Sequence, residues 1–166
     1  MTASDPPPPG YRACVGLMLI NRDRLVFAGS RSDSAGAAWQ MPQGGIDAGE
    51  TPRQAALREL AEEVGTDKVE IIAESEDWLT YDLPAAMRPP IWGGRYVGQA
   101  QRWYLMRFTG EDSDIDIAAS ETPEFSAWRW MRLDDLVHGI VAFKRPVYDW
   151  IASEFQDAIR SASETA

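Results

Sequence analysis

The stretch from residue 44 to residue 65, GGIDAGETPRQAALRELAEEVG, constrains the fold of this chain of 166 residues more than any other segment. Thr51 can cap the free backbone N–H groups of a helix, Pro52 suits the first helical position, and Gln54 completes a capping box. Gly65 is a natural stop, because glycine adopts the left-handed conformation that ends helices at little cost. The stretch therefore predicts one helix that follows a glycine-rich loop.

The predicted helix gathers acidic side chains on one side. Because residues advance at ~3.6 per turn, Glu59, Glu62 and Glu63 share one face. The apolar residues that supply its packing faces are Ala56, Leu57, Leu60 and Val64. Carboxylates at these spacings repel one another and raise one another's pKa values. We therefore expect a cation to compensate them, and clustered carboxylate oxygens suit Mg²⁺, with Mn²⁺ or another divalent ion as alternatives.

The alternative interpretation is an acidic helix face that is merely solvated, which explains most clusters of this kind. Here the acidic residues are accompanied by Gly44, Glu50 and Arg58 at fixed spacings. Seven fixed positions of these residue types coincide by chance in on the order of one in a million chains or fewer. The pattern therefore favours metal-assisted chemistry on phosphate.

The same segment resembles the Nudix box, in which G, five residues, E and seven residues precede R-E-hydrophobic-x-E-E-x-G-hydrophobic. Every charged and glycine position matches, and the one departure is Thr66, where the family has an aliphatic residue. The resemblance implies hydrolysis of a nucleoside diphosphate linked to another group. In that reaction water attacks phosphorus while divalent metals are bound.

The resemblance also implies roles for individual residues of the box. It places metal ligands at Gly44, through its backbone carbonyl, and at Glu59, Glu62 and Glu63. Arg58 would pair with Glu50 and orient the cluster, and Gly65 would give structural support. Glu62 is also a candidate for the base that removes a proton from the attacking water.

Beyond the box, the resemblance spans roughly residues 10–158, through segments such as YRACVG, WLTYDLP, GQAQRWYLMRF and TPEFSAWRWM. It points to the branch that contains bacterial RNA 5′-pyrophosphohydrolases and diadenosine-polyphosphate hydrolases. In that branch Glu124 would complete the metal site and is a second candidate for the base. The residues that would contact phosphates are Arg12, Gln99 and Arg102. Candidates for holding phosphate or stacking on a base are Arg31, Trp39, Tyr81, Phe143 and Lys144, although core packing is the alternative for each aromatic residue.

Charge and composition limit the partners. The net charge of −10 argues against a general nucleic-acid binder, and we expect no DNA partner. Fourteen of the sixteen basic residues are Arg, which binds phosphate oxygens through paired hydrogen bonds. We therefore expect the ligand to be a compact polyphosphate or the 5′-end of RNA.

The apolar run at residues 13–20 is too short to span a membrane. A single cysteine, Cys14, is compatible with a reducing cytoplasm, and a single histidine, His138, argues against a histidine-based metal or catalytic site.

The order of elements predicts an α/β/α sandwich with a central mixed sheet, which is also the fold that the resemblance implies. Strands are expected at residues 13–20, 24–28, 69–73, 78–82, 101–108 and 127–131, with a short extended piece at 39–42. A last helix is expected at residues 146–159. We expect a disordered leader at 1–9, one domain at 10–160 and a flexible tail at 161–166.

Three functions fit these observations. The first is removal of pyrophosphate from the triphosphorylated 5′-end of RNA, and the second is hydrolysis of diadenosine tetraphosphate to ATP and AMP. The third is a non-catalytic module that senses a nucleotide, which the complete set of glutamates disfavours. The sequence does not fix the oligomeric state.

Overall fold

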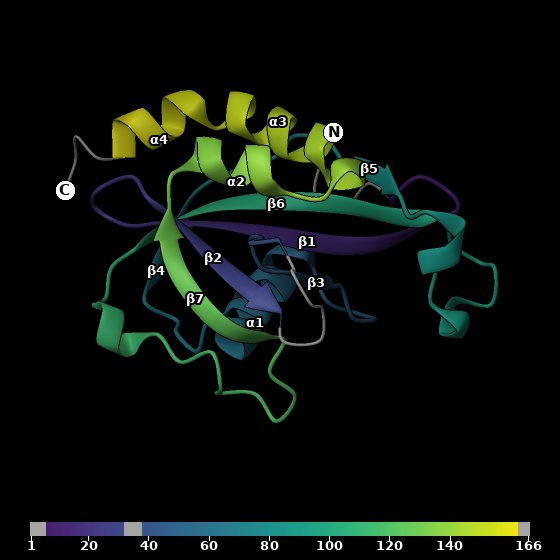
Figure 1. The fold of residues 1–166 in the computed structure, drawn as a ribbon, viewed down its shortest axis with the longest axis horizontal. Coiled ribbons are helices and arrows are strands. Elements are labelled where there is room, and N and C mark those ends of the chain that lie inside the picture. Colours follow the sequence, from purple (N-terminus) through teal and green to yellow (C-terminus); the bar gives the residue numbers. More distant parts are fainter. Residues whose placement is uncertain (1–5, 32–37, 163–166) are drawn as a thin grey trace.

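A mixed β-sheet lies between two helical layers in the computed structural model, which describes residues 6–31 and 38–162 (Figure 1). The strands are β1 (Tyr11–Ile20), β2 (Val26–Arg31), β3 (Gln43–Gly45), β4 (Val69–Glu74), β5 (Leu79–Asp82), β6 (Gly98–Phe108) and β7 (Phe125–Met131). Their order is β4-β6-β1-β2-β7, with β3 paired to β1 and β5 paired to β6. The predicted α/β/α sandwich is confirmed.

The two longest strands, β1 and β6, form the centre of the sheet and run parallel, from the pair Tyr11–Gly98 to the pair Ile20–Arg107. The other strand pairs are antiparallel. Strands that are covered on both faces consist of nearly continuous apolar residues. Residues 14–20 of β1 are all buried for this reason.

Helices cover both faces of the sheet and enclose one core on each side. On one face lies α1 (Pro52–Glu63), whose Leu60 packs near Leu17 and Tyr104. On the other face lie α2 (Leu133–Gly139), α3 (Arg145–Glu154) and α4 (Gln156–Ala162), as Figure 1 shows. Short 3₁₀ helices lie at Ala85–Met87, Pro90–Trp92, Asp112–Asp114 and Ala142–Lys144. The sheet thus separates the α1 layer from the layer that carries Trp103 and Tyr148 in its core.

Helix α1 follows the prediction closely. The N–H of Gln54 donates to Thr51 Oγ1 at 3.1 Å, and the N–H of Thr51 donates to Gln54 Oε1 at 2.9 Å, so the capping box forms. Gly65 adopts a left-handed φ of 77° just past the helix. The prediction for Leu57 was wrong, because its side chain is 41% exposed and does not pack in the core.

Other boundaries differ from the predictions. The strand expected at residues 24–28 is β2, which begins at Val26, because Asn21 Oδ1 accepts hydrogen bonds from the N–H groups of Asp23 and Leu25 and closes a turn there. The extended piece at 39–42 forms only a bridge between Gln40 and Gly29, and the strand comes after it as β3.

The C-terminal helical region also departs from the prediction. The helix expected at 146–159 is two helices, since the N–H of buried Phe155 is shared between the carbonyls of Ile151 and Ser153 and the chain turns there. Helix α2 was not predicted. Residues 161–162 of the expected tail belong to α4, while 163–166 lie outside the described residues.

The expected leader is placed in part against the domain. Residues 6–9 are four prolines that line a groove together with Trp78, Leu79 and Trp150. Residues 1–5 lie outside the described part of the chain.

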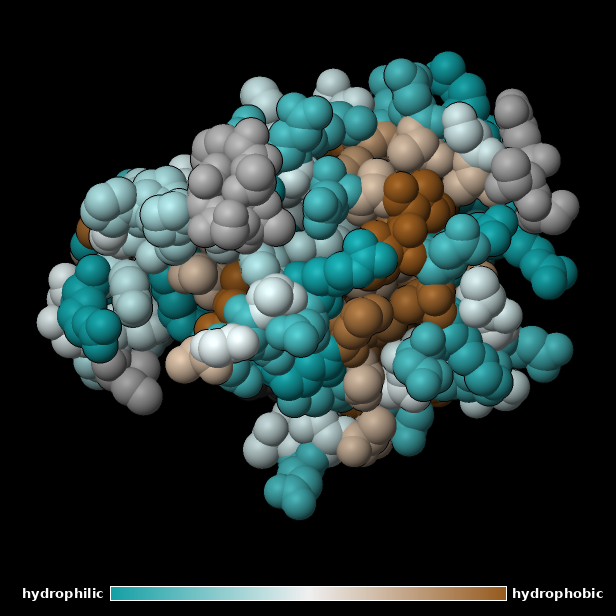
Figure 2. Space-filling model, turned by 180° about the vertical axis from the view of Figure 1, so that it is seen from behind, coloured by the Kyte–Doolittle hydropathy of each residue, from teal (hydrophilic) through white to brown (hydrophobic). Residues whose placement is uncertain are grey.

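One edge of the sheet is apolar. Strand β4 is an edge strand, and its apolar side chains are only half-buried: Val69, Ile71, Ile72 and Ala73. Figure 2, the view from behind, shows a patch of apolar side chains among hydrophilic ones on this half of the molecule. No residue of β4 lines the two pockets described below.

No helix in the described ranges 6–31 and 38–162 has the length and apolar character needed to cross a membrane.

Candidate active site

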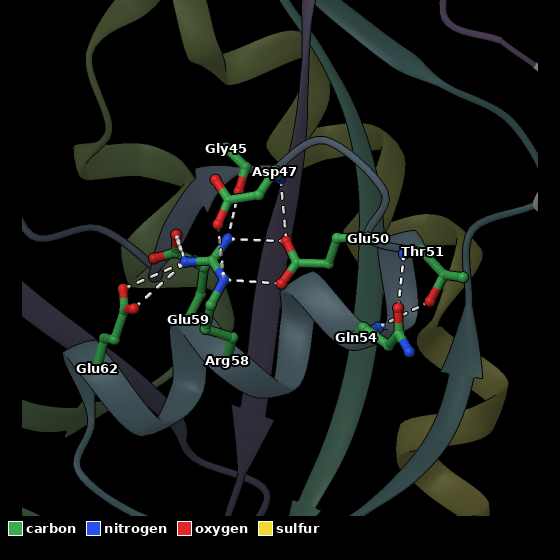
Figure 3. A network of polar contacts seen from close by, with 8 residues as sticks. All are labelled: Gly45, Asp47, Glu50, Thr51, Gln54, Arg58, Glu59 and Glu62. Carbon is green, nitrogen blue, oxygen red and sulfur yellow. Dashed lines mark hydrogen bonds and ion pairs between the residues drawn. The ribbon is translucent and has the colours of Figure 1, made fainter.

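Arg58, near the middle of α1, is the centre of a polar network that joins the helix to the loop before it (Figure 3). Its Nε and Nη2 donate to the two carboxylate oxygens of Glu50 at 2.8 and 3.0 Å, so the predicted pairing of Arg58 with Glu50 is observed. Nη2 also donates to the carbonyl of Gly45 at 2.8 Å, and Nη1 donates to Glu59 Oε1 at 2.9 Å. Nη1 lies 3.3 Å from a carboxylate oxygen of Glu62. One guanidinium therefore fixes the glycine loop and two helix carboxylates relative to one another.

The pairing changes the pKa values of both partners. The hydrogen bonds from Arg58 are the main reason that the pKa of Glu50 lies below its usual value, and the bond from the N–H of Asp47 adds to the effect. Hydrogen bonding to Glu50 raises the pKa of Arg58 in turn. Both groups stay charged over the whole physiological range.

The glycines of β3 allow α1 and β1 to approach closely. A Cβ atom at Gly44 would collide with the carboxylate of Glu59, and a Cβ atom at Gly45 would collide with the guanidinium of Arg12. Glycine is needed wherever another group approaches the backbone this closely. The two glycines therefore bring Glu59 and Arg12 to the wall of one pocket.

An acidic pocket lies between α1, β3 and the loop that precedes β7. Its acidic members are Glu59, Glu62, Glu63 and Glu124, and the others are Arg12, Arg31, Gln43, Gly44, Gly45, Gln99, Ser120 and Thr122. All four glutamates predicted from the sequence therefore meet at one place. Glu124 reaches the pocket from the other end of the chain, just before Phe125 starts β7.

Glu63 carries the least favourable charge of this pocket. Burial raises its pKa to about 10, and the negative charge of Glu124, a hydrogen bond with Glu124 and the charge of Glu59 add to the shift. Burial also raises the pKa of Glu59, against the lowering effect of Arg58. Glu63 Oε2 is buried and has no hydrogen-bond partner. A carboxylate oxygen of this kind, beside two further carboxylates, fits a divalent cation.

As a set, the carboxylates are farther apart than the ligands of a bound metal ion. Among residues 6–31 and 38–162, no three acidic, cysteine or histidine side chains lie at metal-ligand spacing. Arg58 explains part of this, because its Nη1 holds both Glu59 and Glu62. Glu59 Oε1 is bound to Arg58, whereas no hydrogen bond from Arg58 reaches Glu59 Oε2.

A second pocket, largely apolar, adjoins the acidic one. Its apolar members are Tyr81, Leu83, Met87, Pro89, Trp92 and Phe143. The rings of Tyr81 and Phe143 lie 5.7 Å apart between centroids. Four residues line both pockets and so form a shared wall: Arg12, Arg31, Gln43 and Gln99. A ligand with a charged end and a flat apolar end could span this wall.

Lys144 adds a cation to the apolar pocket. Its Nζ donates to Gln40 Oε1 at 3.2 Å and lies 5.8 Å from the centre of the Tyr81 ring. Burial lowers the pKa of Lys144 to about 8, the charge of Arg31 lowers it further, and the charge of Glu124 opposes the shift. The charge of this lysine therefore depends on pH near neutrality.

Two predicted contact residues do not reach the site. Arg102 is buried, and its Nη1 donates to the carbonyls of Ser75 and Glu76 at 3.1 and 3.0 Å. Successive residues of a strand point to opposite faces, so Arg102 and Gln99, which are three positions apart in β6, cannot face the same pocket. Trp39 stacks under Arg129, with 4.1 Å from Arg129 Cζ to the ring centre, and lines a separate groove beside β7 and α2. The structure corrects the sequence-based prediction for both residues.

The sequence interpretation missed several residues that line the two pockets: Gln43, Ser120, Thr122, Leu83, Met87 and Trp92. Gln43 immediately precedes the paired glycines and could have been found from that position. Trp92 lies in a loop rich in proline and glycine, where no periodicity indicates which side chain points inward.

The match to known proteins defines the class. Residues 10–151 match the NUDIX domain, so the chain belongs to the NUDIX domain family. The RNA pyrophosphohydrolase of Roseobacter denitrificans is 57% identical over 148 residues, which cover 88% of this chain and 92% of that protein. The RNA pyrophosphohydrolase of Wolbachia sp. subsp. Brugia malayi (strain TRS) is 55% identical over 150 residues, with 90% and 92% covered.

Solved structures agree with this assignment at the level of the fold. The crystal structure of a C. elegans Ap4A hydrolase binary complex has a TM-score of 0.60 and 19% identity, and covers 87% of this chain and 98% of that one. The family resemblance inferred from the sequence is thereby confirmed. Nudix hydrolases generally use divalent metal ions.

Proposed function

We propose that this chain hydrolyses the triphosphorylated 5′-end of RNA and releases pyrophosphate, with divalent metal ions bound. The observation that carries the proposal is the shared wall of Arg12, Arg31, Gln43 and Gln99 between the acidic pocket and the apolar one. A 5′-triphosphate RNA has the matching shape, since its triphosphate is a charged chain and the first ribose links that chain to a flat base. The names of the two relatives at 57% and 55% identity support RNA as the substrate.

We assign the metal site to the side chains of Glu59, Glu62, Glu63 and Glu124 and to the backbone carbonyl of Gly44. Mg²⁺ is the proposed ion, and Mn²⁺ is the alternative, because both prefer oxygen ligands. When bound, such ions neutralise charge on the phosphate oxygens and lower the pKa of water. The unpaired Oε2 of Glu63 supports this assignment. Metal ligands must be deprotonated, so the raised pKa of Glu63 would make metal binding stronger as pH rises.

The base that accepts a proton from the attacking water is Glu62 or Glu124. Both are exposed enough to meet water, and both line the acidic pocket. Glu62 is held by Arg58 at 3.3 Å, whereas Glu124 lies beside Glu63. Loss of the base would lower kcat by roughly 100-fold to 10,000-fold with a smaller effect on binding.

The cationic residues around the shared wall are proposed to hold the phosphates: Arg12, Arg31 and Lys144. Tyr81 and Phe143 are proposed to contact a base.

Because the whole chain carries a charge of −10, it would repel a long polyanion and accept only the end of an RNA. Cys14 is a free, buried thiol, which supports a reducing cytoplasm as the place of action.

Hydrolysis of diadenosine tetraphosphate is the second candidate. The paired rings of Tyr81 and Phe143 could stack on adenine as readily as on an RNA base. The same pockets would then hold a dinucleotide with its tetraphosphate in the acidic pocket.

A competition assay tests both. Diadenosine tetraphosphate and a short 5′-triphosphate RNA are offered together with Mg²⁺, and pyrophosphate, ATP and AMP are measured. We expect pyrophosphate from RNA to dominate. Glu63→Gln should lose roughly 100-fold or more in rate, since even residues behind the metal ligands cost up to that much. The matched control is Glu70→Gln on the exposed face of β4, which should keep the wild-type rate.

Dominant formation of ATP and AMP would make the chain a dinucleotide hydrolase. If neither substrate reacted and the wild type behaved like Glu63→Gln, the chain would be a non-catalytic nucleotide-binding module.

A further inference from the structure

A row of amide side chains lies behind the shared wall of the two pockets. Gln99, Gln101 and Trp103 are alternate residues of β6, so their side chains share one face of the sheet. Gln43 of β3 lies one strand away, because Gly16 of β1 pairs with Gln43 on one side and with Trp103 on the other. These side chains form a continuous set of hydrogen bonds from the core to the pocket.

The row begins at the indole of Trp103, which donates through Nε1 to Gln101 Oε1 at 2.9 Å. An indole N–H can only donate, so the oxygen of Gln101 must face Trp103. Trp103 is fully buried, and its ring packs so closely on Gly16 that a Cβ atom there would collide with it. The indole is therefore fixed in place, and the orientation of the Gln101 amide is fixed with it.

The amide nitrogen of Gln101 then sets the orientation of two further glutamines. Nε2 donates to Gln43 Oε1 and to Gln99 Oε1, at 3.0 Å in both bonds, which uses both of its hydrogens. Both glutamines must therefore turn their oxygens inward. Gln43 Nε2 donates to the Tyr81 hydroxyl at 3.3 Å and lies 3.5 Å from Gln99 Oε1.

The groups that remain for a ligand are donors. Among the described residues, no hydrogen bond uses the NH₂ group of Gln99, which lines both pockets. The Tyr81 hydroxyl accepts from Gln43 and keeps its own hydrogen, because burial raises its pKa. Phosphate oxygens accept hydrogen bonds, so a wall that presents N–H and O–H groups fits them.

We propose that Trp103 and Gln101 are positioning residues that make the shared wall a hydrogen-bond donor toward phosphate. Neither residue lines a pocket, and both act through Gln43 and Gln99. The inference rests on the proposed polyphosphate substrate. If the amides of Gln43 and Gln99 turned over, they would present oxygen atoms to an anion and weaken its binding.

The test is Gln101→Glu, which keeps the size and shape of the side chain. In the ionised variant one carboxylate oxygen can still accept from Trp103, but the other cannot donate, so Gln43 and Gln99 must turn their NH₂ groups inward to reach it. We expect KM for the 5′-triphosphate RNA to rise roughly 10-fold or more, while kcat changes little, because hydrogen bonds to charged groups are the strong ones. The control for the added charge is Gln156→Glu on exposed α4, which should leave KM unchanged.

A neutral second variant, Trp103→Phe, removes the donor that orients Gln101 together with part of a buried ring, so its fold is checked by circular dichroism. It should raise KM by a few-fold, and NMR spectra of the side-chain amides should show Gln99 losing its response to inorganic tripolyphosphate. The wild type should show that response even if RNA is not its substrate, which separates this inference from the proposed function. If folded Gln101→Glu or Trp103→Phe binds tripolyphosphate and substrate as Gln156→Glu does, the inference is overturned.

Discussion

Lys144 is the residue whose charge is most sensitive to pH near neutrality in the apolar pocket. Its pKa of about 8 lies below the ordinary value of 10.5, mainly because of burial and then because of Arg31. The folded chain therefore releases this proton more readily than the unfolded chain. Consequently the contribution of Lys144 to the free energy of unfolding rises between about pH 8 and pH 10.5. Phosphate binding follows the opposite trend, since only the protonated amine attracts an anion.

We expect KM for the polyphosphate substrate to rise as pH increases through about 8, where Lys144 loses its charge. Lys144→Arg keeps the charge at all these pH values and should flatten the rise. Steady-state kinetics between pH 7 and pH 9.5 measure this, and kcat should follow a separate profile.

The chain offers a matched control because it contains only one other lysine, Lys68. Lys68 pairs with Asp114 at 2.8 Å and has a raised pKa through that hydrogen bond. Lys68→Arg should keep the wild-type pH profile. A profile for Lys144→Arg that still rises like the wild type would contradict the role given to Lys144.

Residue roles could be predicted from the sequence where the match to the Nudix box implied them. The resemblance predicted that Arg58 pairs with Glu50, and this pairing is observed. Arg102 was placed wrongly because its contact depends on strand parity, which puts it on the face of β6 opposite Gln99. The hydrogen bonds of Gln101 could not be predicted in full, because one partner, Gln43, lies 58 positions away in the chain.

At the scale of elements, the site depends on the close packing of β3 against α1. Gly44 of β3 lies where any side chain would collide with the carboxylate of Glu59. Glu59 cannot retreat freely, since Arg58 holds it and its side chain is buried. The strand and the helix are thus joined at a point where one methyl group would displace a proposed metal ligand.

We predict that Gly44→Ala lowers kcat by on the order of 100-fold, because a displacement of about 1 Å at a catalytic group can have that effect. The fold should survive, since β3 is a short strand of three residues. Gly139→Ala is the control, because nothing lies within 4 Å of a Cβ atom there and its φ is not left-handed. Circular dichroism and steady-state rates measure both variants, and a Gly44→Ala enzyme with normal kcat would rule out the close approach.

The bounds of a helix could be predicted from the sequence where capping residues mark its two ends. The capping box at Thr51 and the left-handed Gly65 mark α1 in the sequence itself. Helix α2, with seven residues, has no side-chain cap at Arg132 and was missed. The break between α3 and α4 follows from the burial of Phe155, which is decided by packing on the sheet and not by local sequence.

At the scale of the whole molecule, the sheet brings together carboxylates from distant parts of a chain that already carries a charge of −10. Glu63 comes from α1 and Glu124 from the loop before β7, and the charge of Glu124 disfavours the charged form of Glu63 and raises its pKa. The fold accepts this repulsion without gaining stability from it. A bound divalent ion would remove the repulsion and satisfy the unpaired Oε2 of Glu63 at the same time.

We therefore predict that Mg²⁺ stabilises the folded chain. A ligand that binds only the folded state at 100 times its Kd adds about 2.7 kcal/mol to the free energy of unfolding. For a chain of this size that gain corresponds to a rise in Tm of roughly 5 to 10 °C. Melting curves in EDTA and in Mg²⁺ measure it. Glu63→Gln should lose most of the rise, whereas Glu70→Gln should keep it. If Mg²⁺ raised the Tm of Glu63→Gln as much as that of the wild type, the ion would bind elsewhere, and the unpaired oxygen of Glu63 would need another partner.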